Sequence, residues 1–412
     1  MLKYFAGFNV LLYYSYAYLY FFNEELTAIK PAYWYMLSIS AGFIYLFLSG
    51  KLKIKFDSSL YMIAWAAILF LFSALSYTIS IQPEAGFQTL ISWMESLLLL
   101  ILFIYIFQDE AILHFAAKSL VLVLFISVLI NYYDFVFPGM FSKDIGRAAG
   151  MYENANISGG YLVFGMVISV WVFPKRMRSL YCIFIATGVI VTFSRSSMMM
   201  WAMAMLLLAW KNAFVVSRGP AIMSMFVLML FLVLTLVSGV WFKVFQAVGV
   251  DSYLSENAKN RIGGSFIEQK DNASLSRQYA AKLAWGLFIK SPIIGHGLGS
   301  TQEGNTAVGA HNMYLRLAVE MGIIGFIFIV ALIVILWKSS SNVASIIAIL
   351  YTFLSFFTHN SIEQVAMQII IAMSVAGTLE KQNSEFSGNN SNSTKELSQP
   401  KPPLSGVTLK LT

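Results

Sequence analysis

Charged residues are scarce in this 412-residue sequence. Asp, Glu, Lys and Arg make up 11% of the chain, whereas soluble globular domains carry about 25%. Hydrophobic residues make up 58%, and they fall in blocks of about 18 to 22 residues, long enough to cross a hydrocarbon core roughly 30 Å thick. The composition excludes a soluble globular protein and predicts an all-α, polytopic membrane protein.

Cysteine and clustered metal ligands are also scarce. The single cysteine, Cys182, lies in an apolar segment, so no disulfide within the chain can form, and a small core or lipid-facing role is expected. No D-x-D, HExxH or Cys/His cluster occurs in the predicted outer loops, which disfavours a metal site. The net charge of +7 is interpreted as the positive-inside bias of a membrane protein rather than as a nucleic-acid surface.

About twelve membrane spans are predicted. They cover residues 4–22, 32–49, 59–76, 87–107, 115–137, 157–173, 180–193, 197–210, 221–238, 311–337, 343–358 and 364–379. Alternate short loops carry most of the basic residues, namely Lys51, Lys53, Lys55, Lys175, Arg176, Arg178, Lys211, Arg218 and Lys338. The basic side is expected to be cytoplasmic, with both termini inside. The first span follows Lys3 without an A-x-A-like cleavage site, so we expect it to be retained.

The organisation predicted from these spans has four parts. Residues 1–238 hold spans one to nine, residues 239–310 form one large extracytoplasmic loop, residues 311–379 hold spans ten to twelve, and residues 380–412 form a disordered cytoplasmic tail. A structureless loop as long as the large one would be unusual, so it is expected to be ordered. Within it, residues 275–290 are predicted to form a helix with a stripe of Ala280, Leu283, Ala284, Leu287 and Phe288.

Three arginines are predicted to lie at the extracytoplasmic side. Arg195 interrupts a hydrophobic stretch at a tight turn, and Arg147 precedes a Gly-, Asn- and Ser-rich re-entry. Arg277 stands on the apolar stripe of the loop helix, where a bound anion would serve as its partner. The alternatives are a snorkelling arginine at 195, an ordinary loop charge at 147, and an ion pair of Arg277 with Glu268 or Asp271.

His311 also falls on the extracytoplasmic side, at the start of the tenth span. The positive end of the helix dipole and the nearby arginines disfavour the imidazolium, so a neutral imidazole is expected. A neutral imidazole can accept a proton as a general base. The alternative is an interfacial histidine hydrogen-bonded to the backbone, and the next residue, Asn312, is a good helix cap.

Three further features carry weaker signals. The segment GHGLGS at residues 295–300 is expected to form a turn, with a backbone anion nest as the alternative. Arg316 and Glu320 are spaced to pair on one helix face. Glu95 lies in the middle of the fourth span, and no role is assigned to it.

Four segments together resemble a known family. They are GRAAGMYENANISGGYL, TFSRSSMMM, SRQYAAKLAWGLFIKSPIIGHGLGS and HNMYLRLAVEMGIIG, in that order over about residues 145–335. The chain resembles the O-antigen ligase family, which also includes O-antigen polymerases and some protein O-oligosaccharyltransferases. The last segment is similar to the ligase pattern of His, then Asn, Ser or Gln, then nine residues and Gly-x-x-Gly. One departure is Ala155, where many relatives have proline.

The resemblance implies a metal-independent, inverting C-type (GT-C) glycosyltransferase without a cofactor. The implied donor is a glycan on undecaprenyl pyrophosphate, and the implied acceptor is a sugar hydroxyl of lipid A-core, at the periplasmic face of a Gram-negative inner membrane. It implies His311 as the base and Arg195, Arg277 and Arg147 as pyrophosphate ligands. The residues expected to support this site are Asn312, Asn156, Gly295, Gly297, Gly299 and Gly322.

The sequence also allows two alternative functions. The first keeps the same donor but transfers the glycan to another lipid-linked unit or to a protein. The second is a polysaccharide transporter or flippase, which predicts ionisable residues near the membrane midplane. The three arginines singled out above are predicted instead at the outer edge of the membrane.

Overall fold

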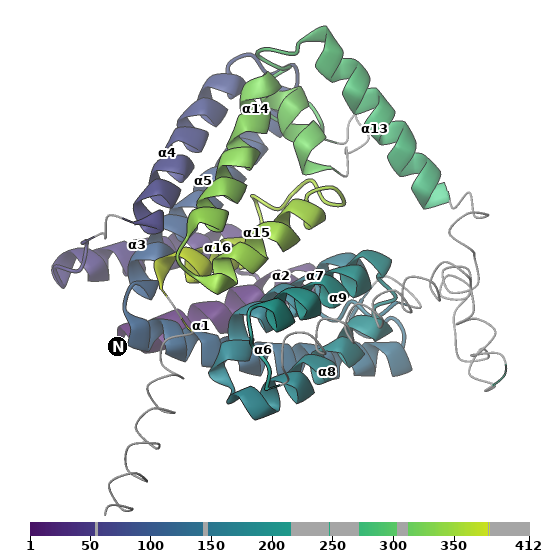
Figure 1. Ribbon diagram of the computed structural model, residues 1–412. Coiled ribbons are helices and arrows are strands. Elements are labelled where there is room, and N and C mark those ends of the chain that lie inside the picture. The colour runs from purple at the N-terminus through teal and green to yellow at the C-terminus, as the bar shows by residue number, and fades with distance from the viewer. Residues whose placement is uncertain are drawn as a thin grey trace, which may run out of the picture. The chain divides into compact units, whose positions relative to one another are not determined.

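The computed structural model describes residues 1–53, 57–142, 147–215, 247, 272–302, 312–377 and 379, with the side chains of all of them except residues 272–277. Throughout this part of the chain the regular elements are helices, with no strand (Figure 1). The predicted all-α class is confirmed. The predicted ninth span, the tail at residues 380–412, and residues Lys55, Arg218 and His311 lie outside the described residues.

The described helices follow one another through short turns. They are α1 (Leu2–Tyr14), α2 (Ala17–Asn23), α3 (Pro31–Leu48), α4 (Ser58–Tyr77), α5 (Pro83–Phe107), α6 (Glu110–Val136), α7 (Ala155–Ser169) with the 3-10 turn η1 (Val170–Val172), α8 (Lys175–Val191), α9 (Arg195–Trp210), α13 (Asn272–Lys290), α14 (Met313–Lys338), α15 (Asn342–Leu354) and α16 (Val365–Ala376).

Membrane-spanning character is supported in six places. Among the described helices, α3, α4, α5, α6, α7 with η1, and α14 are long and apolar enough to cross a membrane. Helices α8, α9, α15 and α16 overlap predicted spans, but each has fewer residues than any of these six helices. The predicted total of twelve spans therefore stays a prediction.

Local signals explain where several helices begin. The side chains of Asp57, Asp109 and Asn154 accept hydrogen bonds from backbone amides in the first turns of α4, α6 and α7, which satisfies donors that a helix start leaves free. Pro31 and Pro83 occupy the first positions of α3 and α5, where the missing N–H has no cost.

The helices pack around one continuous hydrophobic core. Helix α5 contacts α3, α4 and α16, while α6 contacts α1, α7 and α8. Helix α7 is buried on all sides and also contacts α9, α15 and α16. The loop helix α13 packs against α14 (Figure 1). Here Ala284, Leu287 and Phe288 meet Leu315 and Val319, as the apolar stripe predicts, although Leu283 is exposed.

The predicted first span at residues 4–22 is wrong in one respect, because the helix breaks at Tyr16. This residue has a φ of 59°, in the left-handed region. Its ring packs 5.0 Å from that of Tyr152 and 5.8 Å from that of Tyr161, and Ser15 bonds back to the Leu11 carbonyl. Tertiary packing of a tyrosine thus overrides a continuous apolar run.

The predicted span at residues 311–337 is also broken. Gly322 has φ 66° and ψ −155°, which interrupts α14. The short first half, residues 313–321, folds back beside the longer second half, residues 323–338 (Figure 1). The rings of Tyr314 and Phe326 lie 6.0 Å apart, although twelve residues of a straight helix would separate them by about 18 Å. We call residues 313–321 the half-helix.

Two glycines make this reversal sterically feasible. A β-carbon on Gly322 would overlap the carbonyl of Ile293, and one on Gly325 would overlap the carbonyl of Leu317. Gly322 also occupies a backbone region that is open to glycine alone among the common residues. In the Gly-x-x-Gly pair, the first glycine therefore allows the chain to reverse and the second allows the returning helix to approach Leu317 closely.

We expect Gly322→Ala to destabilise the protein by about 3 kcal/mol, from backbone strain together with the overlap at Ile293. Gly286→Ala is the matched control, because Gly286 lies within α13 and a β-carbon there meets nothing within 4 Å. The measurement is the thermal unfolding midpoint in detergent. Equal midpoints for the two variants would contradict the proposed role of the break.

Candidate functional site

The break in α14 frees backbone groups, and the loop at residues 291–302 satisfies them. His296 N donates to the Val319 carbonyl at 2.8 Å, and Gly297 N donates to the Glu320 carbonyl at 3.0 Å. Ile323 N donates to the Pro292 carbonyl at 2.9 Å. The loop therefore completes the hydrogen bonding of an interrupted helix, as buried backbone requires.

This arrangement leaves little room for an anion nest in GHGLGS. The backbone amides of residues 295, 296, 297, 298 and 300 donate to the carbonyls of Ser291, Val319, Glu320, Ser76 and Gly297. Gly295, Gly297 and Gly299 have φ values of 74°, 90° and 80°, and a β-carbon on any of them would overlap neighbouring backbone. These three predicted supporting residues lie in a loop packed against α14 and the α4–α5 turn.

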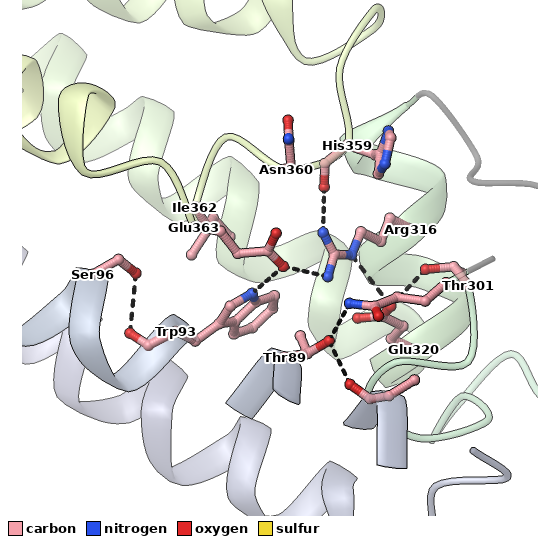
Figure 2. Close-up of polar contacts among 12 residues, drawn as sticks. Thr89, Trp93, Ser96, Thr301, Arg316, Glu320, His359, Asn360, Ile362 and Glu363 are labelled. Atoms are coloured by element: carbon pink, nitrogen blue, oxygen red, sulfur yellow. Dashed lines mark hydrogen bonds and ion pairs between the residues drawn. The ribbon is translucent and has the colours of Figure 1, made fainter. Parts of the chain in front are cut away.

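A buried cluster of charged side chains lies between the half-helix and the segment that joins α15 to α16 (Figure 2). Arg316 is 2% exposed and Glu320 is fully buried, and the Arg316 Nε donates to Glu320 Oε1 at 3.2 Å. Arg316 Nη2 lies 2.5 Å from Glu363 Oε1, and Nη1 donates to the His359 carbonyl at 2.7 Å. The predicted pairing of Arg316 with Glu320 is confirmed, and Glu363 joins it from the α15–α16 segment.

Neighbouring polar groups complete this cluster. The Trp93 Nε1 donates to Glu363 Oε1 at 3.0 Å, and the Thr301 hydroxyl donates to Glu320 Oε1 at 2.5 Å (Figure 2). Gln302 donates to Thr89 on α5. Removing one partner from a buried ion pair typically costs about 3–5 kcal/mol, so the cluster links α5, the loop and the half-helix strongly.

Arg147 and Asn156 form a second group at the start of α7. Arg147 is 9% exposed, and its Nη2 donates to Asn156 Oδ1 at 2.8 Å. Asn154 caps the helix by accepting from the amides of Asn156 and Ile157, each at 3.0 Å. The structure thus brings together two residues that were predicted separately, one as a ligand and one as support.

Asp134, near the end of α6, fixes the loop that carries Arg147. Its buried carboxylate accepts from the amides of Phe141, Ser142, Ala149 and Gly150 at 3.0–3.3 Å. Sequence reasoning missed this residue because its partners are backbone groups, which leave no side-chain pattern. A lone carboxylate near the outer end of a span was the available signal.

Arg195 is the first residue of α9, which begins next to Asn156. Ser194 caps this helix, and the Ser197 hydroxyl donates to the Asn156 carbonyl at 3.3 Å. The first turns of α7 and α9 therefore meet at Asn156, whose side chain is held by Arg147. Two helix starts therefore meet beside Arg147, and Arg195 is the first residue of one of them. Helix starts and arginines are the groups that favour a bound anion. We call Arg147, Asn156 and Arg195 the arginine corner.

The arginine corner adjoins the segment that holds the buried ion cluster. The Tyr161 hydroxyl on α7 donates to Gln364 Oε1 at 2.5 Å. Glu153 keeps exposed surface. Partial burial of its carboxyl nevertheless raises its pKa, and the negative charge of Glu363 raises that pKa further. Helix α7, which begins at the arginine corner, therefore contacts the segment that carries Glu363.

The remaining predicted residues are placed only in part. Asn312 caps the half-helix by accepting from Leu315 N at 3.1 Å, as predicted, whereas His311 lies outside the described residues. Arg277 stands one turn before Ala280 in α13, and its side chain is likewise not described. The catalytic and ligand roles of these residues stay predictions.

Glu363 and His359 also escaped the sequence analysis. Both lie in the polar stretch THNSIEQ, residues 358–364, between two apolar runs. That stretch was a usable signal, because it stands on the predicted outer side. Within the described residues, no group of three or more His, Cys, Asp or Glu side chains is placed to hold a metal ion.

Comparison with known proteins identifies one domain. The family model described as O-Antigen ligase matches residues 180–330, a range that contains Arg195, Arg277, His311 and Gly322. No curated protein and no solved structure matches the chain. The matched range contains the last three of the four segments that carry the resemblance, and supports it over that part of the chain.

We expect Asp134→Asn to loosen the loop that carries Arg147, since an amide NH₂ would face backbone N–H donors, with a loss of about 2 kcal/mol. Hydrogen exchange should accelerate at the amides of residues 141, 142, 149 and 150. Asp109→Asn is the control, because asparagine caps a helix as well as aspartate does. Unchanged exchange at these amides would show that Asp134 does not fix the loop.

Proposed function

Since the chain carries a domain of the O-antigen ligase family over residues 180–330, we propose that it is a membrane glycosyltransferase acting as an O-antigen ligase. It would transfer a glycan from undecaprenyl pyrophosphate to a sugar hydroxyl of lipid A-core during lipopolysaccharide synthesis. The enzyme would span the bacterial inner membrane, with cytoplasmic termini and a periplasmic site on a C-type glycosyltransferase scaffold.

One observation carries this proposal beyond the family match. Helix α7, which begins at the arginine corner, contacts the segment that anchors the start of the half-helix through the hydrogen bond from Tyr161 to Gln364. This contact supports the proposal, because the proposed anion site and the half-helix, which follows His311 in sequence, are both attached to residues 363–364. A transferase that expels pyrophosphate needs an anion site beside its base.

The proposed reaction is a single displacement. His311 accepts the proton of the acceptor hydroxyl, the hydroxyl oxygen bonds to the anomeric carbon, and the carbon–oxygen bond to pyrophosphate breaks with inversion. Arg195 and Arg277, with Arg147 as a third, take the charge of the leaving pyrophosphate. Guanidinium forks match phosphate oxygens and stay charged, so these residues would act without a metal ion.

Two other functions are outcomes of the test. A polymerase or protein O-oligosaccharyltransferase would use the same donor and the same base with another acceptor. A transporter would move the lipid-linked glycan without forming a new glycosidic bond.

The test uses the full chain in proteoliposomes with lipid-linked repeat units, with and without lipid A-core. Glycan transfer to lipid A-core, with release of undecaprenyl pyrophosphate, is expected. Longer lipid-linked chains without lipid A-core would replace the ligase assignment with a polymerase. If no undecaprenyl pyrophosphate is released under any condition, the whole proposal is contradicted.

We expect His311→Ala to lower transfer at least about 100-fold through loss of the base. Arg195→Lys should lower transfer by a comparable factor, because it keeps the charge but loses the fork. Arg176→Ala is the control, since Arg176 is exposed at the start of α8. Normal transfer by His311→Ala would remove the proposed base.

A further inference from the structure

Arg316 occupies an unfavourable position for a cation. It lies in the first turns of the half-helix, near the positive end of the helix dipole, and it is almost completely buried. A buried guanidinium at such a position needs strong partners to stay charged. The nature of those partners indicates what the residue does.

The guanidinium of Arg316 joins separate parts of the chain (Figure 2). Glu320 lies one turn further along the same helix, whereas the Glu363 carboxylate and the His359 carbonyl belong to the segment after α15. Glu363 is held in turn by Trp93 of α5, and the Trp93 ring lies 5.8 Å from the guanidinium carbon. Three different nitrogens of the planar guanidinium each donate to one of these acceptors, an arrangement that the single nitrogen of lysine does not reproduce.

The start of the half-helix depends on such lateral contacts. The helix reverses at Gly322 after nine residues, so no long continuation fixes its direction. Met313 N donates to the Ser355 carbonyl at 2.8 Å, and the Tyr314 hydroxyl donates to the Thr352 carbonyl at 3.1 Å. These two bonds, and those from Arg316 to His359 and Glu363, attach the helix start to residues 352–363.

We propose that Arg316 is a positioning residue for the transfer reaction. With Glu363 and Glu320 it fixes the start of the half-helix against residues 352–363, and in sequence this start and its capping residue directly follow His311. This inference rests on the proposed function, in which His311 is the base. A misplacement of about 1 Å costs such a base roughly 100-fold in rate.

The chain offers a matched control in Arg178, which is 1% exposed. Its side chain donates to the carbonyls of Phe173 and Ala213 and lies 4.6 Å from the Trp171 ring. Arg178 is therefore also a buried arginine over a tryptophan, but it joins the α7–α8 turn to the end of α9. Its loss should destabilise the fold without moving the half-helix.

The experiment compares Arg316→Lys with Arg178→Lys in the proteoliposome assay, with kcat, the KM for the lipid-linked donor and the unfolding midpoint measured for each. We expect Arg316→Lys to lower kcat at least about tenfold with little change in KM. Arg178→Lys should lower the midpoint to a similar extent and leave kcat near that of the wild type. Equal losses of kcat in the two variants would assign Arg316 a purely structural role.

A second variant keeps the test decisive if Arg316→Lys does not fold. Glu363→Gln removes the charge of the partner and keeps an acceptor for Trp93. It should lower kcat in the same way, and Glu363→Gln with Arg316→Lys should be no worse than the poorer single variant, because the two residues act as one unit. Multiplying effects would overturn the inference, whereas a wild type without transfer would overturn the proposed function itself.

Discussion

The constraint on which this structure depends is that a helix interrupted inside a buried bundle must find partners for the backbone groups it releases. Gly322 ends the half-helix, and the carbonyls of Val319 and Glu320 then accept from His296 and Gly297. A loop that arrives from a different part of the chain thus becomes an integral part of the helix. Because lipid offers no hydrogen bonds to such groups, the loop and the break must exist together.

Ion pairs between side chains also hold the half-helix in place. One guanidinium, that of Arg316, meets two carboxylates, of which Glu320 is fully buried and Glu363 partly open. Next to Glu363 in sequence, Gln364 accepts a hydrogen bond from Tyr161 of α7. Polar contacts therefore extend from the α4–α5 turn through the loop and the half-helix to residues 359–364, and from there to α7, while apolar side chains fill the space around them.

The sequence predicted what depends on local pattern. Apolar blocks located most of the described helices, the stripe at Ala284 and Phe288 located the face by which α13 packs, and the spacing of Arg316 and Glu320 gave their pairing. The reversal at Gly322 was missed, since glycine is common in straight membrane helices and the hydrophobic run continues through it. Asp134 was missed because its partners are backbone amides in a loop.

The place of the Glu363 carboxylate has a consequence for the direction of the electric field. The arginine corner combines two helix starts with Arg147, and the segment that α7 contacts through Tyr161 and Gln364 carries this carboxylate. Breaking a glycosidic bond to pyrophosphate places negative charge on the leaving group and positive character on the sugar ring. A field built into the folded chain would already point along that separation of charge, so little reorganisation would be needed when the bond breaks.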